Sequence, residues 1–133
     1  MWEVFKEVSG NIEGKMQDSG ERQQFESGAV RDTTTGKGRF DLISPELMFR
    51  LAKWSELGSI KYSDRNWEKG MPISRCCDSA MRHLVKYLDG WDDEDHLAAC
   101  AWNCMAIMHF EKHKPELQDI PSWVNKEVDN ATI

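Results

Sequence analysis

Apolar residues recur at the spacing of an α-helix in three stretches of the chain. One face of residues 45–62 carries Leu47, Leu51, Trp54, Leu57 and Gly58, and the stripe of residues 72–88 is Cys77, Met81, Leu84, Val85 and Leu88. The third stretch, residues 92–113, is apolar nearly all round from Leu97 to Phe110. A helix that is apolar all round is buried on all sides. The pattern therefore predicts an all-α fold, a helical bundle with residues 92–113 at its centre.

Local signals mark the ends of these helices. Ser44 is a capping hydroxyl, and Pro45 follows it at the first helical position. Asp89-Gly90 ends the second helix, and Asp92 or Asp93 is expected to cap the third. We find no strand pattern and no internal repeat.

The remaining segments are polar or rich in glycine. Trp2, Phe5 and Val8 could form one short amphipathic turn, which we expect to be mobile or to dock on a partner subunit. Residues 28–43 are expected to form a loop that carries Arg31, Lys37 and Arg39. The predicted organisation is an N-terminal segment, a helical domain and a C-terminal tail, at residues 1–27, 28–113 and 114–133.

The overall charge and apolar content limit the function classes. The chain has 133 residues, enough for one domain, and a formal net charge of −6, which argues against binding to a nucleic-acid polymer or an anionic membrane. No apolar run approaches the roughly 18 residues of a membrane span. The first residues lack the pattern of a signal peptide. We therefore expect a cytoplasmic protein whose four cysteines are thiols.

The central helix also predicts an assembly of several chains. A helical domain of roughly 90 residues cannot easily bury such a helix on every side. We therefore expect a homo-oligomer, a dimer or a tetramer, whose subunits share a core.

The segment between the first two helices, residues 61–70, is unusually rich in functional side chains. Lys61 and Arg65 could bind phosphate oxygens, and Asn66 and Trp67 could hold a base. The alternative is a solvated loop whose Trp67 fills a gap in the core. Composition alone does not decide between the two.

Acidic residues on all three helices are candidates for a metal site. They are Glu56, Asp78, Glu94 and Asp95. Carboxylates that converge from several helices are the usual ligands of Mg²⁺ or Mn²⁺ in a bundle. His96 and Asn103 lie two turns apart on the same face of the third helix and could complete the site. Each residue also has a structural alternative, such as an i,i+4 ion pair of Asp78 with Arg82 or a helix cap at Asp95.

A zinc site is a second possibility. His96, Cys100 and Cys104 follow one another at i, i+4 and i+8, and Cys76 or Cys77 could add a fourth ligand. Paired CxxC spacings are absent, and three successive turns of one helix rarely converge on one tetrahedral ion.

An ordered series of motifs resembles a known family. The motifs are Gly28-Ala29-x-Arg31-Asp32, Lys37-x-Arg39-Phe40-Asp41-Leu42-Ile43, Gly58-x-x-Lys61-Tyr62-x-x-Arg65-Asn66-Trp67-x-x-Gly70, Ala80-x-Arg82-His83-Leu84, Asp95-His96-Leu97-Ala98 and Trp102-Asn103. They are similar to the phage and bacterial dATP/dGTP diphosphohydrolase N-terminal family, which includes MazZ-like enzymes. This family is related to the all-α MazG-type nucleoside triphosphate pyrophosphohydrolases. The resemblance covers about residues 28–113.

The resemblance implies an oligomeric, MazG-like helical enzyme of phage nucleotide metabolism. Such an enzyme cleaves dGTP or dATP to the monophosphate and pyrophosphate with Mg²⁺ or Mn²⁺. The implied metal ligands are Glu56, Asp78, Glu94, Asp95 and His96, of which Glu56, Asp78 and Asp95 would be catalytic. The implied substrate-binding residues are Arg31, Lys37, Arg39, Lys61, Arg65, Asn66, Trp67, Arg82 and Asn103. The alternative function is a non-catalytic oligomeric module that binds a phosphorylated ligand or a protein partner.

Overall fold

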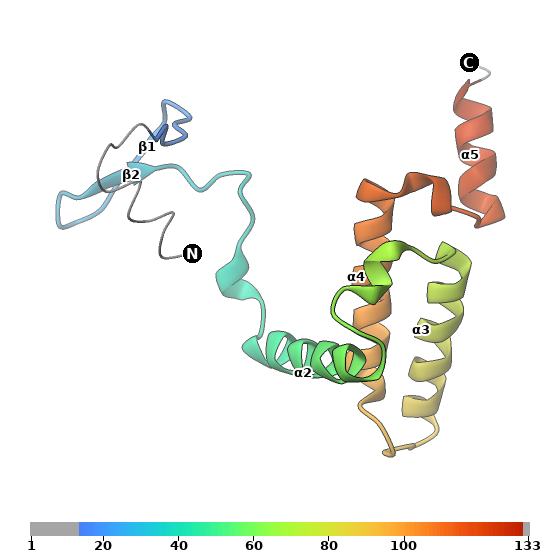
Figure 1. Cartoon of the computed structure of the whole chain (residues 1–133). Helices are drawn as coiled ribbons and strands as arrows, with labels where there is room; N and C mark the ends of the chain where they lie inside the picture. Colours follow the sequence, from blue (N-terminus) through green and yellow to red (C-terminus); the bar gives the residue numbers. More distant parts are fainter. Residues whose placement is uncertain (1–13, 132–133) are drawn as a thin grey trace. The chain divides into compact units, whose positions relative to one another are not determined.

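The chain is mostly helical, as the apolar pattern predicts. The computed structural model describes residues 14–131, with side chains through Lys126, so the expected turn at Trp2, Phe5 and Val8 lies outside the described residues. The helices are α2 (Pro45–Lys61), α3 (Ile73–Leu88), α4 (His96–His113) and α5 (Pro121–Ala131), and the 3₁₀ helices are η1 (Phe40–Leu42), η2 (Asn66–Lys69) and η3 (Pro115–Leu117) (Figure 1). The all-α class is confirmed. No helix among the described residues is both long and apolar enough to cross a membrane.

Among the described residues, those up to Phe40 form one compact unit, and those from Asp41 onward form a second. The first contains a small antiparallel hairpin of β1 (Arg22–Gln24) and β2 (Val30–Asp32), so the prediction of a plain loop without strands is wrong here. The strands are short and almost wholly exposed, and therefore have no buried face that would produce an alternating apolar pattern. Gly28 closes the turn at φ 89°, a backbone conformation that favours glycine.

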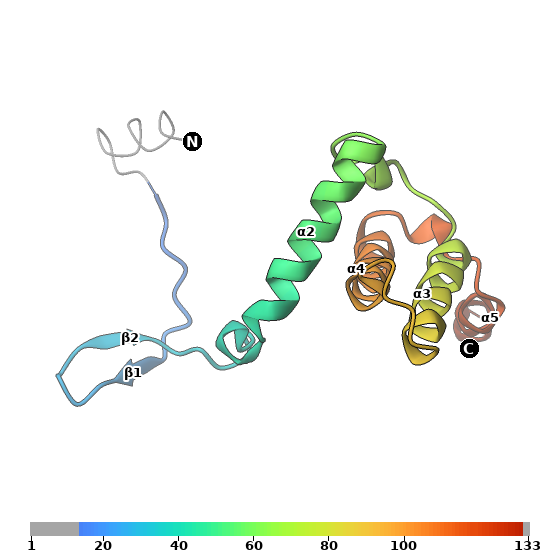
Figure 2. The same ribbon diagram turned by 90° about the horizontal axis from the view of Figure 1, so that it is seen from below.

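The core of the second unit lies mainly between α3 and α4. Its fully buried centre consists of Ile73 and Cys76 from α3 and Ala106 and Phe110 from α4. The short turn after α3 sends α4 back along it, so that the two helices lie side by side (Figures 1 and 2). Helix α2 packs against α4 but buries none of its own residues.

The apolar stripe predicted for the second helix is not part of this core. The buried residues of α3 are Ile73, Cys76 and Ala80. Met81, Val85 and Leu88 are 68%, 60% and 77% exposed. The prediction followed the most regular apolar stripe, but α4 covers the neighbouring face of α3, which carries smaller side chains. Helix α4 is likewise not covered on all sides within one chain, since Cys104 and Met108 are exposed.

The helix ends follow the expected capping chemistry with one difference. The Ser44 hydroxyl accepts a hydrogen bond from the backbone N–H of Glu46, as predicted. Helix α4 is capped by Asp95, which accepts from the N–H of Ala98 at 3.1 Å, and not by Asp92 or Asp93. The two earlier acids belong to the turn instead, because the chain needs those residues to reverse direction after α3.

The segment after α4 is packed against the same core. The Asp119 carboxylate accepts a hydrogen bond from the backbone N–H of Ser74 at 2.8 Å, which satisfies a free donor at the start of α3. Leu117 and Ile120 pack against the core cluster. At Gly70 the backbone has φ 104°, and an added Cβ would lie 2.9 Å from the Leu117 side chain. The predicted tail is therefore well structured and ends in α5.

Candidate functional site

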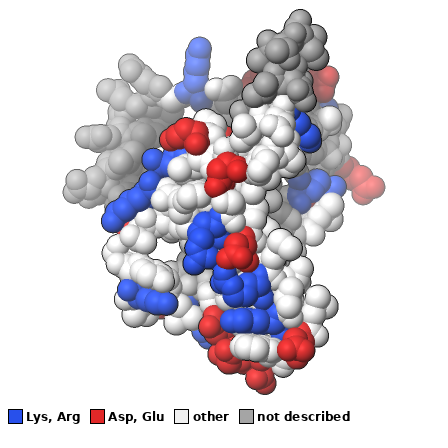
Figure 3. Space-filling model, turned by 90° about the vertical axis from the view of Figure 1, so that its right-hand side faces the viewer, with Lys and Arg blue, Asp and Glu red and all other residues white. Residues whose placement is uncertain are grey.

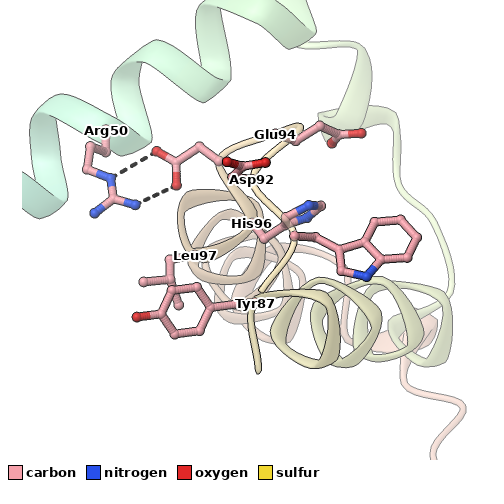
Figure 4. A pocket seen from close by; sticks show the side chains of 8 residues that line it. Arg50, Tyr87, Asp92, Glu94, His96 and Leu97 are labelled. Carbon is pink, nitrogen blue, oxygen red and sulfur yellow. Dashed lines mark hydrogen bonds and ion pairs between the residues drawn. The ribbon is translucent and has the colours of Figure 1, made fainter. Parts of the chain in front are cut away.

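The turn between α3 and α4 forms the floor of an open hollow. Gly90, at φ 84°, lets the chain leave α3, and the N–H of Trp91 donates to the carbonyl of Lys86 at 3.0 Å. The hollow has a volume of about 400 Å³, within the range of small-molecule sites. Its lining comes from α2, the end of α3, the turn and the start of α4, and consists of Arg50, Tyr87, Trp91, Asp92, Glu94, Asp95, His96 and Leu97 (Figure 4).

Two histidines meet beside this hollow. His83 Nδ1 on α3 lies 2.9 Å from His96 Nδ1, and His96 Nε2 lies 2.8 Å from the Asp93 carboxylate. His96 is buried, with 2% of its surface exposed. Burial lowers the pKa of His83 below its ordinary value of 6.5. Potential ligand atoms of His83, Glu94 and His96 all lie within 4.8 Å of one another.

A charged pair joins α2 to the start of α4. Arg50 donates to the two oxygens of Asp95 from Nε at 2.9 Å and from a terminal nitrogen at 2.6 Å (Figure 4). The hydrogen bond from Arg50 is the main cause that lowers the pKa of the Asp95 carboxyl below its usual range. Asp95 is therefore ionised at neutral pH.

Two aromatic rings complete the lining. Tyr87 and Trp91 are each about half exposed, at 52% and 49%. Lys86 places its ammonium 4.9 Å from the centre of the Trp91 ring. An exposed aromatic face beside cations and carboxylates suits a ligand that combines a flat ring with phosphates.

The hollow brings together some of the predicted metal ligands but not all. Glu94, Asp95 and His96 line it. Glu56 is exposed on α2 and is not among the lining residues. Asp78 forms ion pairs with Arg75 and Arg82 on the exposed side of α3, which is the structural alternative noted for it. Figure 3 shows basic side chains over the α3 side of the second unit and acidic side chains at the end where the turn lies.

The predicted base-binding residues of the interhelical loop lie elsewhere. Trp67 packs against the core, with its ring 4.8 Å from that of His109 and 5.5 Å from that of Trp102. This arrangement corresponds to the alternative in which Trp67 fills a gap in the core. The Asn66 side chain accepts from Lys69 at 3.4 Å.

The predicted cations are likewise spread over several surfaces. Arg65 pairs with Glu68 at 2.7 Å, and the Lys61 ammonium lies 5.1 Å from the ring centre of Tyr62. Arg31, Lys37 and Arg39 belong to the first unit, where Lys37 pairs with Asp32 at 2.9 Å.

The structure supports neither the predicted substrate contact of Asn103 nor the predicted zinc site with cysteine ligands. Asn103 is buried and donates to the Ala99 carbonyl of its own helix at 2.8 Å. Within residues 14–126, the one group of three potential metal ligands contains no cysteine, so the described residues give no support to a zinc site with cysteine ligands. Burial raises the pKa of both the Cys76 and the Cys100 thiol.

Sequence reasoning missed His83 and Arg50. No local signal shows that His83 faces His96, because His96 is the first residue of α4 whereas His83 lies inside α3, away from its end at Leu88. No local pattern marks Arg50, because its role depends on how α2 crosses α4.

A comparison with protein families agrees with the family resemblance of the sequence motifs. A family model described as dATP/dGTP diphosphohydrolase, N-terminal, matches residues 27–120, well over half of the chain. The chain therefore belongs to this family, and the resemblance drawn from the motifs is confirmed. No curated protein and no solved structure matches it.

Proposed function

We propose that the protein is a metal-dependent deoxynucleoside triphosphate pyrophosphohydrolase of phage nucleotide metabolism, active in the host cytoplasm. It would convert dGTP or dATP to the monophosphate and pyrophosphate. The family membership supports the substrate class. The observation that carries the proposal is the hollow itself, where acids, a guanidinium and two aromatic rings converge from three helices and a turn.

The acids of the hollow have the donor type that a divalent ion takes, but the structure does not gather three of their oxygens at one point. Asp92, Glu94 and Asp95 supply carboxylate oxygens, the donor type that Mg²⁺ and Mn²⁺ accept. When bound, the ion would neutralise phosphate oxygens and lower the pKa of a water molecule. In this proposal Glu94 and Asp95 are its first candidate ligands, whereas Glu56 and Asp78 lie outside the hollow and stay predictions from the sequence.

The other residues of the hollow would bind and orient the substrate. Arg50 can offer N–H groups to a phosphate in the same planar geometry with which it now binds Asp95. Trp91 and Tyr87 can stack on the purine. Asp95, whose two oxygens accept hydrogen bonds from Arg50, would hold this guanidinium in position beside the hollow.

The test is hydrolysis of each of the eight common ribo- and deoxyribonucleoside triphosphates with Mg²⁺ or Mn²⁺, with products separated by ion exchange. We expect a monophosphate and pyrophosphate, formed fastest from dGTP or dATP. Release of inorganic phosphate instead would place the cleavage at another bond. If the folded, metal-supplemented protein cleaves no triphosphate, the proposal fails, and the alternative of a non-catalytic phosphate-binding module gains support.

We also propose that the protein functions as a homo-oligomer. The regular stripe of Met81, Leu84, Val85 and Leu88 along α3 is exposed in a single chain. On α2, Met48, Phe49 and Ile60 are exposed as well, and this helix buries none of its residues. A second copy that covers the α3 stripe would remove a contiguous apolar surface from water.

Light scattering coupled to size-exclusion chromatography measures this assembly. We expect wild-type protein to run at a multiple of the single-chain mass. Val85→Glu should shift it to smaller species, because a charge would have to be buried at the interface. Arg75→Gln, on the polar side of the same helix, is the matched control and should leave the mass unchanged. A wild-type mass of one chain would contradict the assembly, and an unchanged Val85→Glu would exclude this face.

A further inference from the structure

His83, His96 and Glu94 would discriminate between metal ions more strongly than the carboxylates around them. His83 comes from the last two turns of α3, and His96 is the first residue of α4. The turn at Gly90 places them face to face, 2.9 Å apart at their Nδ1 atoms. Glu94 stands at the same spot, with a carboxylate oxygen within 4.8 Å of ligand atoms on both rings.

Hydrogen bonding fixes the proton on His96. Its Nε2 lies 2.8 Å from Asp93 Oδ1, and an ionised carboxylate only accepts hydrogen bonds. Nε2 of His96 therefore carries a proton, and in the neutral ring Nδ1 presents a lone pair to His83. A carboxylate behind a histidine in this way is the common support of a histidine metal ligand.

The distance between the two rings suits a shared metal ion. At the right angle of an octahedral ion, two metal–nitrogen bonds of about 2.1 Å hold their nitrogens about 3.0 Å apart, whereas a tetrahedral angle would hold them about 3.4 Å apart. The observed 2.9 Å agrees with the octahedral value. Without an ion, the same distance is bridged by a proton that His83 donates to His96. When an ion binds, the His83 proton moves from Nδ1 to Nε2, so that Nδ1 presents its lone pair to the metal.

From this geometry we propose that His83 Nδ1, His96 Nδ1 and a Glu94 carboxylate oxygen bind a divalent first-row transition ion in preference to Mg²⁺, with Asp93 positioning His96. Imidazole nitrogens bind Co²⁺ and Zn²⁺ more tightly than Mn²⁺, and Mg²⁺ prefers an all-oxygen shell. Three protein ligands leave positions open for water or a phosphate oxygen. The role of this centre in hydrolysis rests on the proposed function, but its existence does not.

Titration with Co²⁺ tests the site without nucleotide. The visible absorption of Co²⁺ reports its ligands, and calorimetry with Mn²⁺ and Mg²⁺ reports the preference. We expect one Co²⁺ per chain at this site. His83→Gln and Glu94→Gln should each weaken binding by at least about 100-fold, and Asp93→Asn by about 10-fold to 100-fold. Glu94 is exposed, so its variant tests the site even if His83→Gln does not fold.

The matched control is His113→Gln. His113 lies one turn from His109 at the far end of α4, with their ring centres 4.4 Å apart, and this pair could bind Co²⁺ adventitiously. Binding that survives His113→Gln but not His83→Gln supports the proposal. Unchanged affinity in His83→Gln and Glu94→Gln, no Co²⁺ binding by the wild type, or Mg²⁺ binding at least as tight as Mn²⁺ would overturn it. If Co²⁺ binds as expected but no triphosphate is cleaved, the metal centre stands and the proposed function fails.

Discussion

Replacing Asp95 with asparagine should abolish hydrolysis of dGTP and dATP while the protein stays folded. Asparagine is as good a helix cap as aspartate, so the bond from the Ala98 N–H that starts α4 can be kept. The variant loses the negative charge that faces the hollow, and because asparagine has a single acceptor oxygen it also loses one of the two hydrogen bonds from Arg50. We expect kcat/KM to fall by at least about 100-fold, the scale seen when one electrostatic contact to a transition state is removed.

Steady-state kinetics and circular dichroism on the same sample measure this effect. Glu111→Gln removes a carboxylate from the exposed end of α4 and should leave both signals unchanged. Glu56→Gln tests the prediction from the sequence that Glu56 takes part in catalysis, and we expect a loss of turnover there too. Full activity in both Asp95→Asn and Glu56→Gln would remove these two residues from the mechanism.

Truncation of Phe110 should cost the largest part of the fold's stability. Phe110 is fully buried and packs with Ile73, Cys76 and Ala106 at the centre of the core. Phe110→Ala would leave a cavity and lose apolar burial, which typically costs about 3–5 kcal/mol. Domains of this size are stabilised by roughly 5–15 kcal/mol in total. We therefore expect a partly unfolded protein or a strongly lowered melting temperature.

Urea unfolding followed by circular dichroism gives the change in free energy. Glu111→Ala, at the next position of α4, has an exposed side chain and should change the stability by less than about 0.5 kcal/mol. A Phe110→Ala variant that is as stable as the wild type would show that the α3–α4 core is not what holds this unit together.

Local sequence signals predicted the helices well. The Ser44-Pro45 start and the helical period gave residues 45–62, and α2 spans Pro45–Lys61. The Asp89-Gly90 break gave the end of α3 at Leu88. These features depend on residues close in sequence, such as caps and a glycine with positive φ. The β1–β2 hairpin was not predicted, because its strands are too short and too exposed to show an alternating apolar pattern.

The choice of buried face and the composition of the site could not be predicted in this way. Helical periodicity identified an apolar stripe on α3, but which stripe α4 covers depends on packing between helices. Trp67 has a polar, loop-like sequence context and yet contacts Phe110 in the core. Arg50 reaches Asp95 across 45 residues of sequence. Such contacts follow from the crossing of α2 over α4, about which no short motif carries information.

The contact between Asp119 and Ser74 limits how far the chain can be truncated from its C-terminal side. The helical motifs end near His113, and a chain shortened to that residue would appear to keep α2, α3 and α4 whole. It would nevertheless leave the first turn of α3 without its capping carboxylate. It would also strip Leu117 and Ile120 from one side of the core. The smallest autonomous folding unit therefore extends at least to Ile120, the residue at which the family match also ends.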